Sequence, residues 1–172
     1  MQKFFAIAVA LFICILPLAD AQSTHQTWRP ATQQELQALL PVRAPVVHER
    51  IETEMRTASG ITNGSGKFIA GVVLITAGYS ANGKYSHFFV TQVPLKIGAF
   101  VLQPGSYLIG WDHKDDALDV KFYESSSGLF LGSVEARLNS SITRVESIRV
   151  WPPSDRSVIQ IGRFTFPYQI GD

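Results

Sequence analysis

Four aspartates lie close together in the second half of the chain, with a spacing that suits a hard cation. Asp112, Asp115, Asp116 and Asp119 all fall within one eight-residue segment. Carboxylate oxygens are the ligands that calcium prefers in proteins. The same residues also suit a solvated hairpin tip, because Asp side chains accept hydrogen bonds from nearby backbone N–H groups. We favour the hairpin tip and expect no cofactor, with calcium bound by these four aspartates as the alternative.

The order of residues in this segment differs from that of an EF-hand calcium loop. Lys114 stands at the third ligand position counted from Asp112, and no glycine stands at the sixth. The histidines offer no metal site either, because their spacing does not place two imidazoles on one face of a helix or strand. They occur singly, as His25, His48, His87 and His113.

Aromatic side chains supply the candidate ligand-binding residues. Tyr107 and Trp111 are four residues apart in a predicted strand, so their side chains share one face. Such residues can stack a sugar or line a site for an apolar ligand. We add Trp151, which ends another predicted strand, and His87, which precedes a pair of phenylalanines. Packing in the protein core is the alternative for each of them.

Several catalytic chemistries are absent from the sequence. Cys14, the only cysteine, lies in the predicted leader, so the mature chain lacks a thiol nucleophile and Cys-ligated zinc. No serine stands in a G-x-S-x-G motif. The glycine-rich segment 60–67 is not a phosphate-binding loop, because Ile61 and Phe68 occupy positions that require Gly and Ser or Thr. We therefore assign no catalytic residue.

The first residues have the pattern of a secretory signal peptide. Lys3 precedes an apolar stretch from Phe4 to Leu18, and Ala19–Ala21 supplies a small-x-small cleavage site. We predict a signal peptide over residues 1–21 and a secreted or periplasmic mature chain without a membrane span. An uncleaved N-terminal anchor is the alternative. A formal net charge of +1 argues against a nucleic-acid partner, which requires a basic surface.

Residues 22–46 are predicted to form an N-terminal extension with one short helix. Thr32 followed by Glu35 is a capping box, and leucines at helical spacing follow it until Pro41. This pattern predicts a helix over about 33–40.

Residues 47–172 are predicted to form one antiparallel β-sandwich of about eight strands, with a small β-barrel as the alternative. Short apolar or alternating runs are separated by Gly, Pro and Asn turns, and no helical pattern follows position 60. We expect Val73 and Ile75 to be buried in a central strand, and Asn82-Gly83 to form a hairpin turn. The predicted strands are 47–56, 68–77, 85–93, 100–102 with its continuation 107–111 beyond a turn, 118–123, 129–138, 145–151 and 158–166. A helix is the alternative for 47–56, because Glu, Arg and Met are good helix formers.

Two segments resemble those of transthyretin-like and carboxypeptidase-regulatory-like exported β-sandwich modules. Residues 102–109, Leu-Gln-Pro-Gly-Ser-Tyr-Leu-Ile, look like the L-x-P-G-x-Y turn of that family. Residues 126–132, Ser-Ser-Gly-Leu-Phe-Leu-Gly, are similar to its G-x-x-x-G hairpin. The resemblance implies a β-sandwich and a binding or accessory role.

These observations predict an exported, non-enzymatic binding or interaction module of the cell envelope or extracellular space. Its partner would be a small molecule, a glycan or a protein. One alternative is a small hydrolase or isomerase that uses His87, Asp112 or His113 as acid–base groups. Another is a structural accessory subunit that docks through an apolar sheet face.

Overall fold

The computed structural model describes residues 27–76 and 84–171, and these residues form an all-β protein with one helix. This confirms the predicted fold class. The elements are β1 (Arg29–Pro30), α1 (Gln33–Leu39), β2 (Arg43–Val46), β3 (Glu49–Thr62), β4 (Phe68–Leu74), β5 (His87–Thr91), β6 (Leu95–Ile97), β7 (Phe100–Leu102), β8 (Gly105–Lys114), β9 (Ala117–Glu124), β10 (Phe130–Leu138), β11 (Glu146–Val150), β12 (Val158–Gly162) and β13 (Phe164–Ile170).

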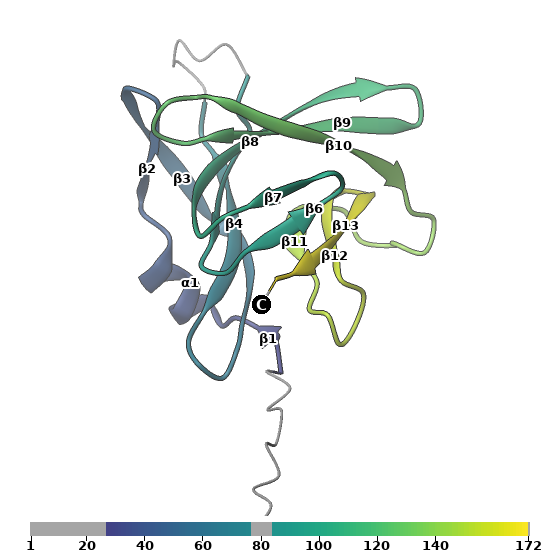
Figure 1. Ribbon diagram of the computed structural model, residues 1–172, viewed down its shortest axis with the longest axis horizontal. Coiled ribbons are helices and arrows are strands. Elements are labelled where there is room, and N and C mark those ends of the chain that lie inside the picture. Colours follow the sequence, from purple (N-terminus) through teal and green to yellow (C-terminus); the bar gives the residue numbers. More distant parts are fainter. Residues whose placement is uncertain (1–26, 77–83, 172) are drawn as a thin grey trace, which may run out of the picture.

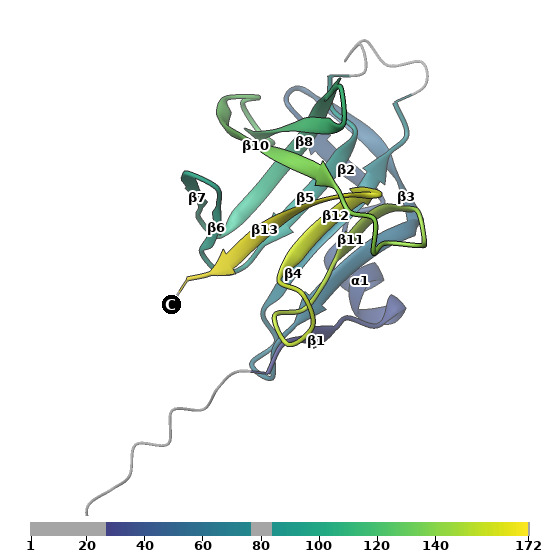
Figure 2. The same ribbon diagram turned by 90° about the vertical axis from the view of Figure 1, so that its right-hand side faces the viewer.

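The strands form one antiparallel 13-stranded sheet that curls almost into a closed barrel, so the barrel alternative describes the architecture (Figures 1 and 2). The main path runs β1-β3-β4-β5-β8-β9-β10-β13-β12-β11, with β2 added beside β3 and the β6–β7 hairpin beside β13. The last strand of the path, β11, comes back against β3 and β4. There the Val150 N–H donates a hydrogen bond to the Ser59 hydroxyl oxygen at 3.1 Å.

Close packing also closes the barrel at this point. Ile148 of β11 lies over Gly71 of β4, and a Cβ atom on Gly71 would fall 2.5 Å from the Ile148 Cδ1 atom. The absence of a side chain at Gly71 therefore allows the two strands to approach each other. Ile148 is 2% exposed, so this contact belongs to the core.

The sheet separates two apolar cores, because alternate residues of each strand point to opposite faces. On β5, Phe89 points into the barrel interior while Phe88 points outward. On β8, Ile109 points into the barrel interior and Leu108 points outward. The outer core is covered by α1 and β2, which Figure 1 shows on one side of the barrel.

The predicted N-terminal helix is confirmed, together with its capping box. The Thr32 hydroxyl oxygen accepts a hydrogen bond from the Glu35 N–H, and the Glu35 carboxylate accepts one from the Thr32 N–H. Leu36 of this helix is 3% exposed and packs in the outer core. The described part of the predicted extension is thus an integral layer of the barrel. No helix among the described residues is long and apolar enough to cross a membrane.

The expected burial of Val73 and Ile75 was wrong. Val73 is half-buried, and Ile75 is 39% exposed, because β4 ends at Leu74 and both side chains belong to the open end of the barrel. Buried positions of this strand are Ile69, Ala70, Gly71, Val72 and Leu74. The predicted Asn82-Gly83 turn lies outside the described residues, as does the predicted signal peptide.

Candidate functional site

The open end of the barrel contains a hollow of about 490 Å³, which we call the mouth pocket. Its walls come from the ends of β4, β8 and β12 and from the starts of β5, β9, β11 and β13. Apolar and aromatic side chains make up the larger part of the lining, and its polar residues are Thr76, Ser86, His87, His113, Glu146 and Ser147. Its defining residues are Val73, His87, Trp111, His113, Val145 and Phe164.

His87 forms part of the inner wall of this pocket and is 4% exposed. Its Nε2 atom lies 3.0 Å from the Ser147 carbonyl oxygen, and its Nδ1 atom lies 2.8 Å from the Ser86 hydroxyl oxygen. Because a carbonyl can only accept, Nε2 carries the proton and Nδ1 is the acceptor in the neutral ring. The Ser86 hydroxyl that faces Nδ1 also lies 3.1 Å from the Ile109 carbonyl oxygen, so its one proton is shared between these two acceptors. Burial lowers the pKa of His87 from 6.5 to about 4, and the bond to Ser147 offsets only part of this effect. His87 is therefore a neutral side chain whose hydrogen bond to Ser147 links β5 to β11.

Trp111 and His113 extend the same face of β8 toward the rim of the mouth pocket. Trp111 is 41% exposed, so its indole ring can contact a ligand. The His113 ring meets the Phe164 ring edge to face, with 5.5 Å between the ring centroids. The structure thus brings two of the predicted ligand-binding residues, His87 and Trp111, to one pocket.

Tyr107 lies outside the mouth pocket and is 7% exposed. Its hydroxyl donates a hydrogen bond to the carbonyl of Gln103, four residues earlier. This geometry is that of a tyrosine corner, in which a Tyr hydroxyl fixes the chain a few residues upstream. Burial raises the pKa of Tyr107, and the nearby Glu124 carboxylate raises it further. Tyr107 therefore stabilises the turn before β8.

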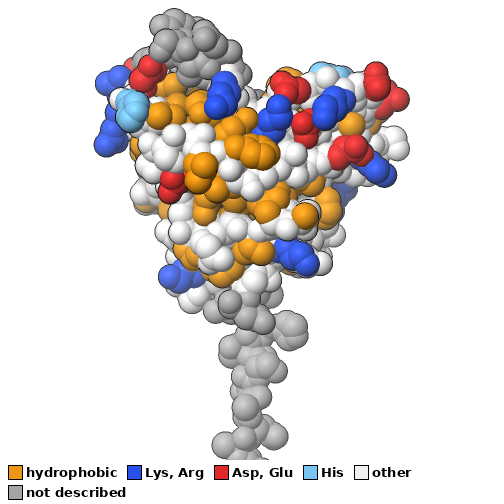
Figure 3. Space-filling view, turned by 45° about the horizontal axis from the view of Figure 1, so that its top comes forward, with side chains coloured by type: hydrophobic (Ala, Val, Ile, Leu, Met, Phe, Trp, Pro, Cys, Tyr) orange, Lys and Arg blue, Asp and Glu red, His pale blue; other side chains and the backbone are white. Residues whose placement is uncertain are grey.

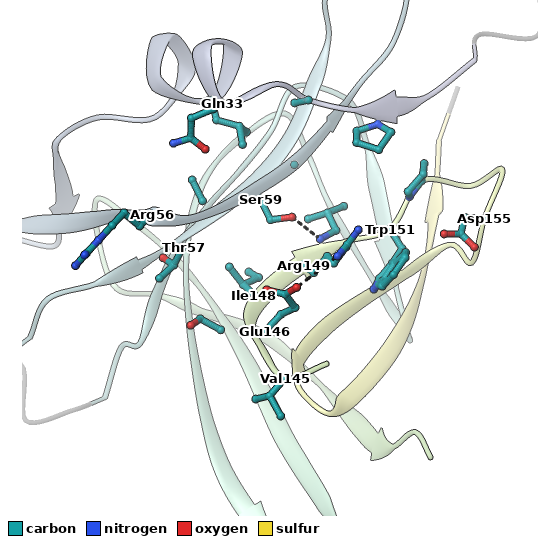
Figure 4. A pocket seen from close by; sticks show the side chains of 18 residues that line it. Gln33, Arg56, Thr57, Ser59, Val145, Glu146, Ile148, Arg149, Trp151 and Asp155 are labelled. Carbon is teal, nitrogen blue, oxygen red and sulfur yellow. Dashed lines mark hydrogen bonds and ion pairs between the residues drawn. The ribbon is translucent and has the colours of Figure 1, made fainter. Parts of the chain in front are cut away.

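Trp151 lies at a second hollow, the seam cleft, which has a volume of about 400 Å³. Figure 4 shows this cleft between β3 and β11, with Ser59 and Arg149 on facing strands. The Trp151 Nε1–H donates to the Gln160 Oε1 atom at 3.0 Å. The Arg149 guanidinium stacks on the indole ring at 4.0 Å from the ring centroid. The four predicted ligand-binding residues thus do not form one site.

The four aspartates of the predicted acidic tip lie on the β8–β9 hairpin. Asp112 and Asp119 are directly opposite each other, and each is ion-paired with a lysine, Asp112 with Lys121 and Asp119 with Lys114. The hydrogen bond from Lys121 holds the pKa of Asp112 below its usual value. In Figure 3, acidic and basic side chains are interspersed at the upper right, where Figure 1 places this hairpin.

Asp115 and Asp116 form the turn between β8 and β9. Asp115 has a φ of 46°, a left-handed conformation that Asp tolerates better than most residues. Within residues 27–76 and 84–171, no three His, Cys, Asp or Glu side chains are grouped to hold a metal ion.

Two of the residues proposed for acid–base chemistry, His87 and His113, line the mouth pocket, whereas Asp112 does not. His87 points into the barrel, whereas Asp112 is ion-paired with the outward-facing Lys121. His113 lies four residues beyond Ile109, the β8 partner of His87, which is roughly 13 Å along the strand.

The mouth pocket also contains residues that the sequence did not single out, chiefly Val145 and Phe164. They come from β13 and from the segment just before β11, far from β5 and β8 in the sequence. Val145 is 66% exposed, so its side chain is open to solvent at the edge of the pocket. In the sequence, Val145 cannot be distinguished from the other apolar residues of the predicted strand 145–151.

Comparisons with family models, with curated proteins and with solved structures find no significant match to this chain.

Proposed function

We propose that this protein is an exported binding module whose mouth pocket holds a small apolar molecule. The observation that carries the proposal is the mouth pocket itself, about 490 Å³ in volume with a largely apolar and aromatic wall. This volume falls within the range of about 300–1,000 Å³ that is typical of small-molecule sites. The mouths of β-barrels are also frequent places for such sites.

Exposure at the rim supports a site open to ligand. Trp111 and Val145 are 41% and 66% exposed, although both line the hollow. A bound apolar molecule would remove this surface from water, and each square ångström so buried contributes roughly 25 cal/mol. The apolar wall favours a hydrophobic ligand over a glycan, which would need many hydrogen-bonding groups.

The polar groups of the pocket favour binding over catalysis. Both ring nitrogens of His87 are engaged, one by Ser147 and the other by Ser86. Burial keeps the imidazole neutral, and neither ring nitrogen is free to exchange a proton with a ligand, so His87 serves as a structural part of the pocket wall.

The proposal can be tested with N-phenyl-1-naphthylamine, an apolar probe that fluoresces on leaving water. We expect saturable binding by the wild-type protein, weakened at least tenfold by Val145→Arg, which places a charge at the pocket rim. Val42→Arg is the matched control, because Val42 is 72% exposed and lies outside the pocket. Equal affinity of the two variants, or no saturable binding by the wild type, would reject the site.

Export is the second part of the proposal and rests on the sequence pattern of residues 1–21. We expect the mature protein to begin at or next to Gln22, which intact-mass spectrometry of the exported chain would establish. Recovery of the full-length chain from the secreted or periplasmic fraction would contradict cleavage.

A further inference from the structure

Three arginines surround a small cavity of about 80 Å³ next to the seam cleft, on the outer side of β11 and β12. They come from the segment before β11, from β11 itself and from the loop that joins β11 to β12. We call this cavity the arginine pocket, and its charged and aromatic residues are Arg144, Glu146, Arg149, Trp151 and Arg156. Nothing in the proposed mouth-pocket function uses it.

Two of the guanidinium groups are held in place by the same indole ring. The Arg149 and Arg156 groups lie 4.0 Å and 4.7 Å from the Trp151 ring centroid. Cation–π stacking of this kind restrains a guanidinium while leaving its N–H edges free to donate. The two side chains are 39% and 36% exposed, so both are partly ordered and still reachable from solvent.

The Trp151 ring is itself held in place by the fully buried side chain of Gln160. The Gln160 Oε1 atom accepts from Trp151, and the Gln160 Nε2 atom donates to the carbonyls of Arg144 and Gly162 at 2.9 Å and 2.7 Å. Gln160 is 0% exposed and its amide is fully engaged. The arginine pocket therefore has a rigid base.

The carboxylates around the pocket leave most guanidinium donors without a protein partner. One Glu146 oxygen serves both Arg144, at 3.0 Å, and Arg149, at 3.4 Å. Asp155 lies 3.7 Å from Arg156, at the far limit of an ion pair. Each guanidinium carries five N–H donors. These three ion pairs are the only polar side-chain contacts that the three arginines make with described residues, so several donors per group face solvent.

We propose that the arginine pocket is a binding site for an oxyanion group, either a carboxylate or a phosphate. Planar guanidinium forks match both groups, because two parallel N–H donors can meet two oxygens. Three cations face two carboxylates here, so one negative charge completes the balance. The adjoining seam cleft, which shares Glu146, Arg149 and Trp151 with the pocket, gives the rest of such a ligand a place to lie.

Isothermal titration of the full mature chain with inorganic phosphate and with acetate, against chloride at constant ionic strength, tests this proposal. We expect saturable binding of at least one of the two oxyanions, and the preferred one identifies the ligand group. Arg144→Gln should weaken that binding about tenfold without affecting the fold, because Arg144 is 82% exposed and does not stack on Trp151. Arg156→Gln should weaken it at least as much.

Arg137→Gln is the matched control, since Arg137 is 83% exposed, pairs with Glu135 on β10 and lies outside the pocket. Its oxyanion affinity should equal that of the wild type. No saturable binding of either oxyanion, or an equal loss in the control, would overturn the proposal. If the arginines serve only to pack Trp151, Arg156→Gln lowers the melting midpoint by the same amount in phosphate, acetate and chloride, which also overturns it.

Discussion

Protonation of His87 should make the stability of this protein fall between pH 7 and pH 5. In the folded chain burial lowers the pKa of His87 to about 4, whereas the unfolded chain titrates near 6.5. The neutral form is therefore favoured by folding, and no stability is lost above the unfolded pKa. As the pH drops below 6.5, the unfolded chain binds a proton that the folded chain does not. The linkage relation converts this difference into a loss of about 2 kcal/mol between pH 7 and pH 5.

Urea denaturation at pH 7, 6 and 5, followed by far-UV circular dichroism, would measure this loss. The His87→Gln variant is the reference, because a glutamine amide can donate to Ser147 and accept from Ser86 but does not titrate. We expect the variant to be less stable than the wild type at pH 7 and to lose much less of its stability by pH 5. Other linked carboxylates fall outside this window, since Glu35 and Glu54 have pKa values lowered to about 2 by their arginine partners.

Parallel pH profiles for the wild type and His87→Gln would refute the argument, because the loss would then belong to another group. A wild-type stability that is flat from pH 7 to pH 5 would refute it as well, since His87 would then be solvated enough to titrate normally.

Three further substitutions test contacts that stabilise the barrel, two at its closure between β11 and β3–β4 and one at the turn before β8. Gly71→Ala should destabilise the fold by about 1–3 kcal/mol, because the new Cβ would lie 2.5 Å from the Ile148 Cδ1 atom. Adding Ile148→Val removes that atom and should recover part of the lost stability in a double-mutant cycle. Simple additivity of the two substitutions would contradict the contact. Tyr107→Phe should cost about 1–3 kcal/mol in urea denaturation, since the Gln103 carbonyl loses its donor, and an unchanged midpoint would show that water replaces the hydroxyl. Ser59→Ala should speed hydrogen exchange at the Val150 amide about tenfold or more without changing exchange in β8; an unaltered Val150 rate would mean that this bond does not hold the seam.

Local signals in the sequence predicted α1 and most of the longer strands, because these signals depend on neighbouring residues, whereas the short strands β1, β2 and β6 were not predicted. The capping box at Thr32 and Glu35 marked the start of α1, and alternating polarity marked β3 and β9. The turn at Asp115–Asp116 followed from the preference of Asp for hairpin tips. Each of these features is determined within a few residues of chain.

The choice between sandwich and barrel could not be made in the same way. It depends on β11 returning to β3, through a bond between Ser59 and Val150 and a contact between Gly71 and Ile148. These partners are far apart in the sequence, and each residue type is ordinary in its own strand. Only the assembled sheet shows that Gly71 on β4, which has no Cβ atom, leaves room for the Ile148 side chain of β11.

The candidate site likewise contains some residues that the sequence indicated and others that only the structure shows. The sequence indicated His87 and Trp111 separately as candidates, but only the pairing of β5 with β8 in the structure brings them to one pocket. Ile75 was misplaced because alternation gives the face of a residue but not where along the strand the core ends. Val145 and Phe164 carried no signal, since they reach the pocket only through the long-range return of β11–β13.

One short segment forms a wall shared by the two hollows. Glu146 and Ser147 line both the mouth pocket and the seam cleft, and β11 is paired as a strand only with β12. On its other side β11 is held by side-chain hydrogen bonds, from His87 to the Ser147 carbonyl and from the Val150 N–H to Ser59. A wall anchored by two such bonds can shift at lower cost than one fixed by a full ladder, because each contributes only about 1 kcal/mol. Val145, Glu146 and Ser147 line both hollows, so a ligand bound in the proposed mouth pocket would contact the same segment that borders the seam cleft.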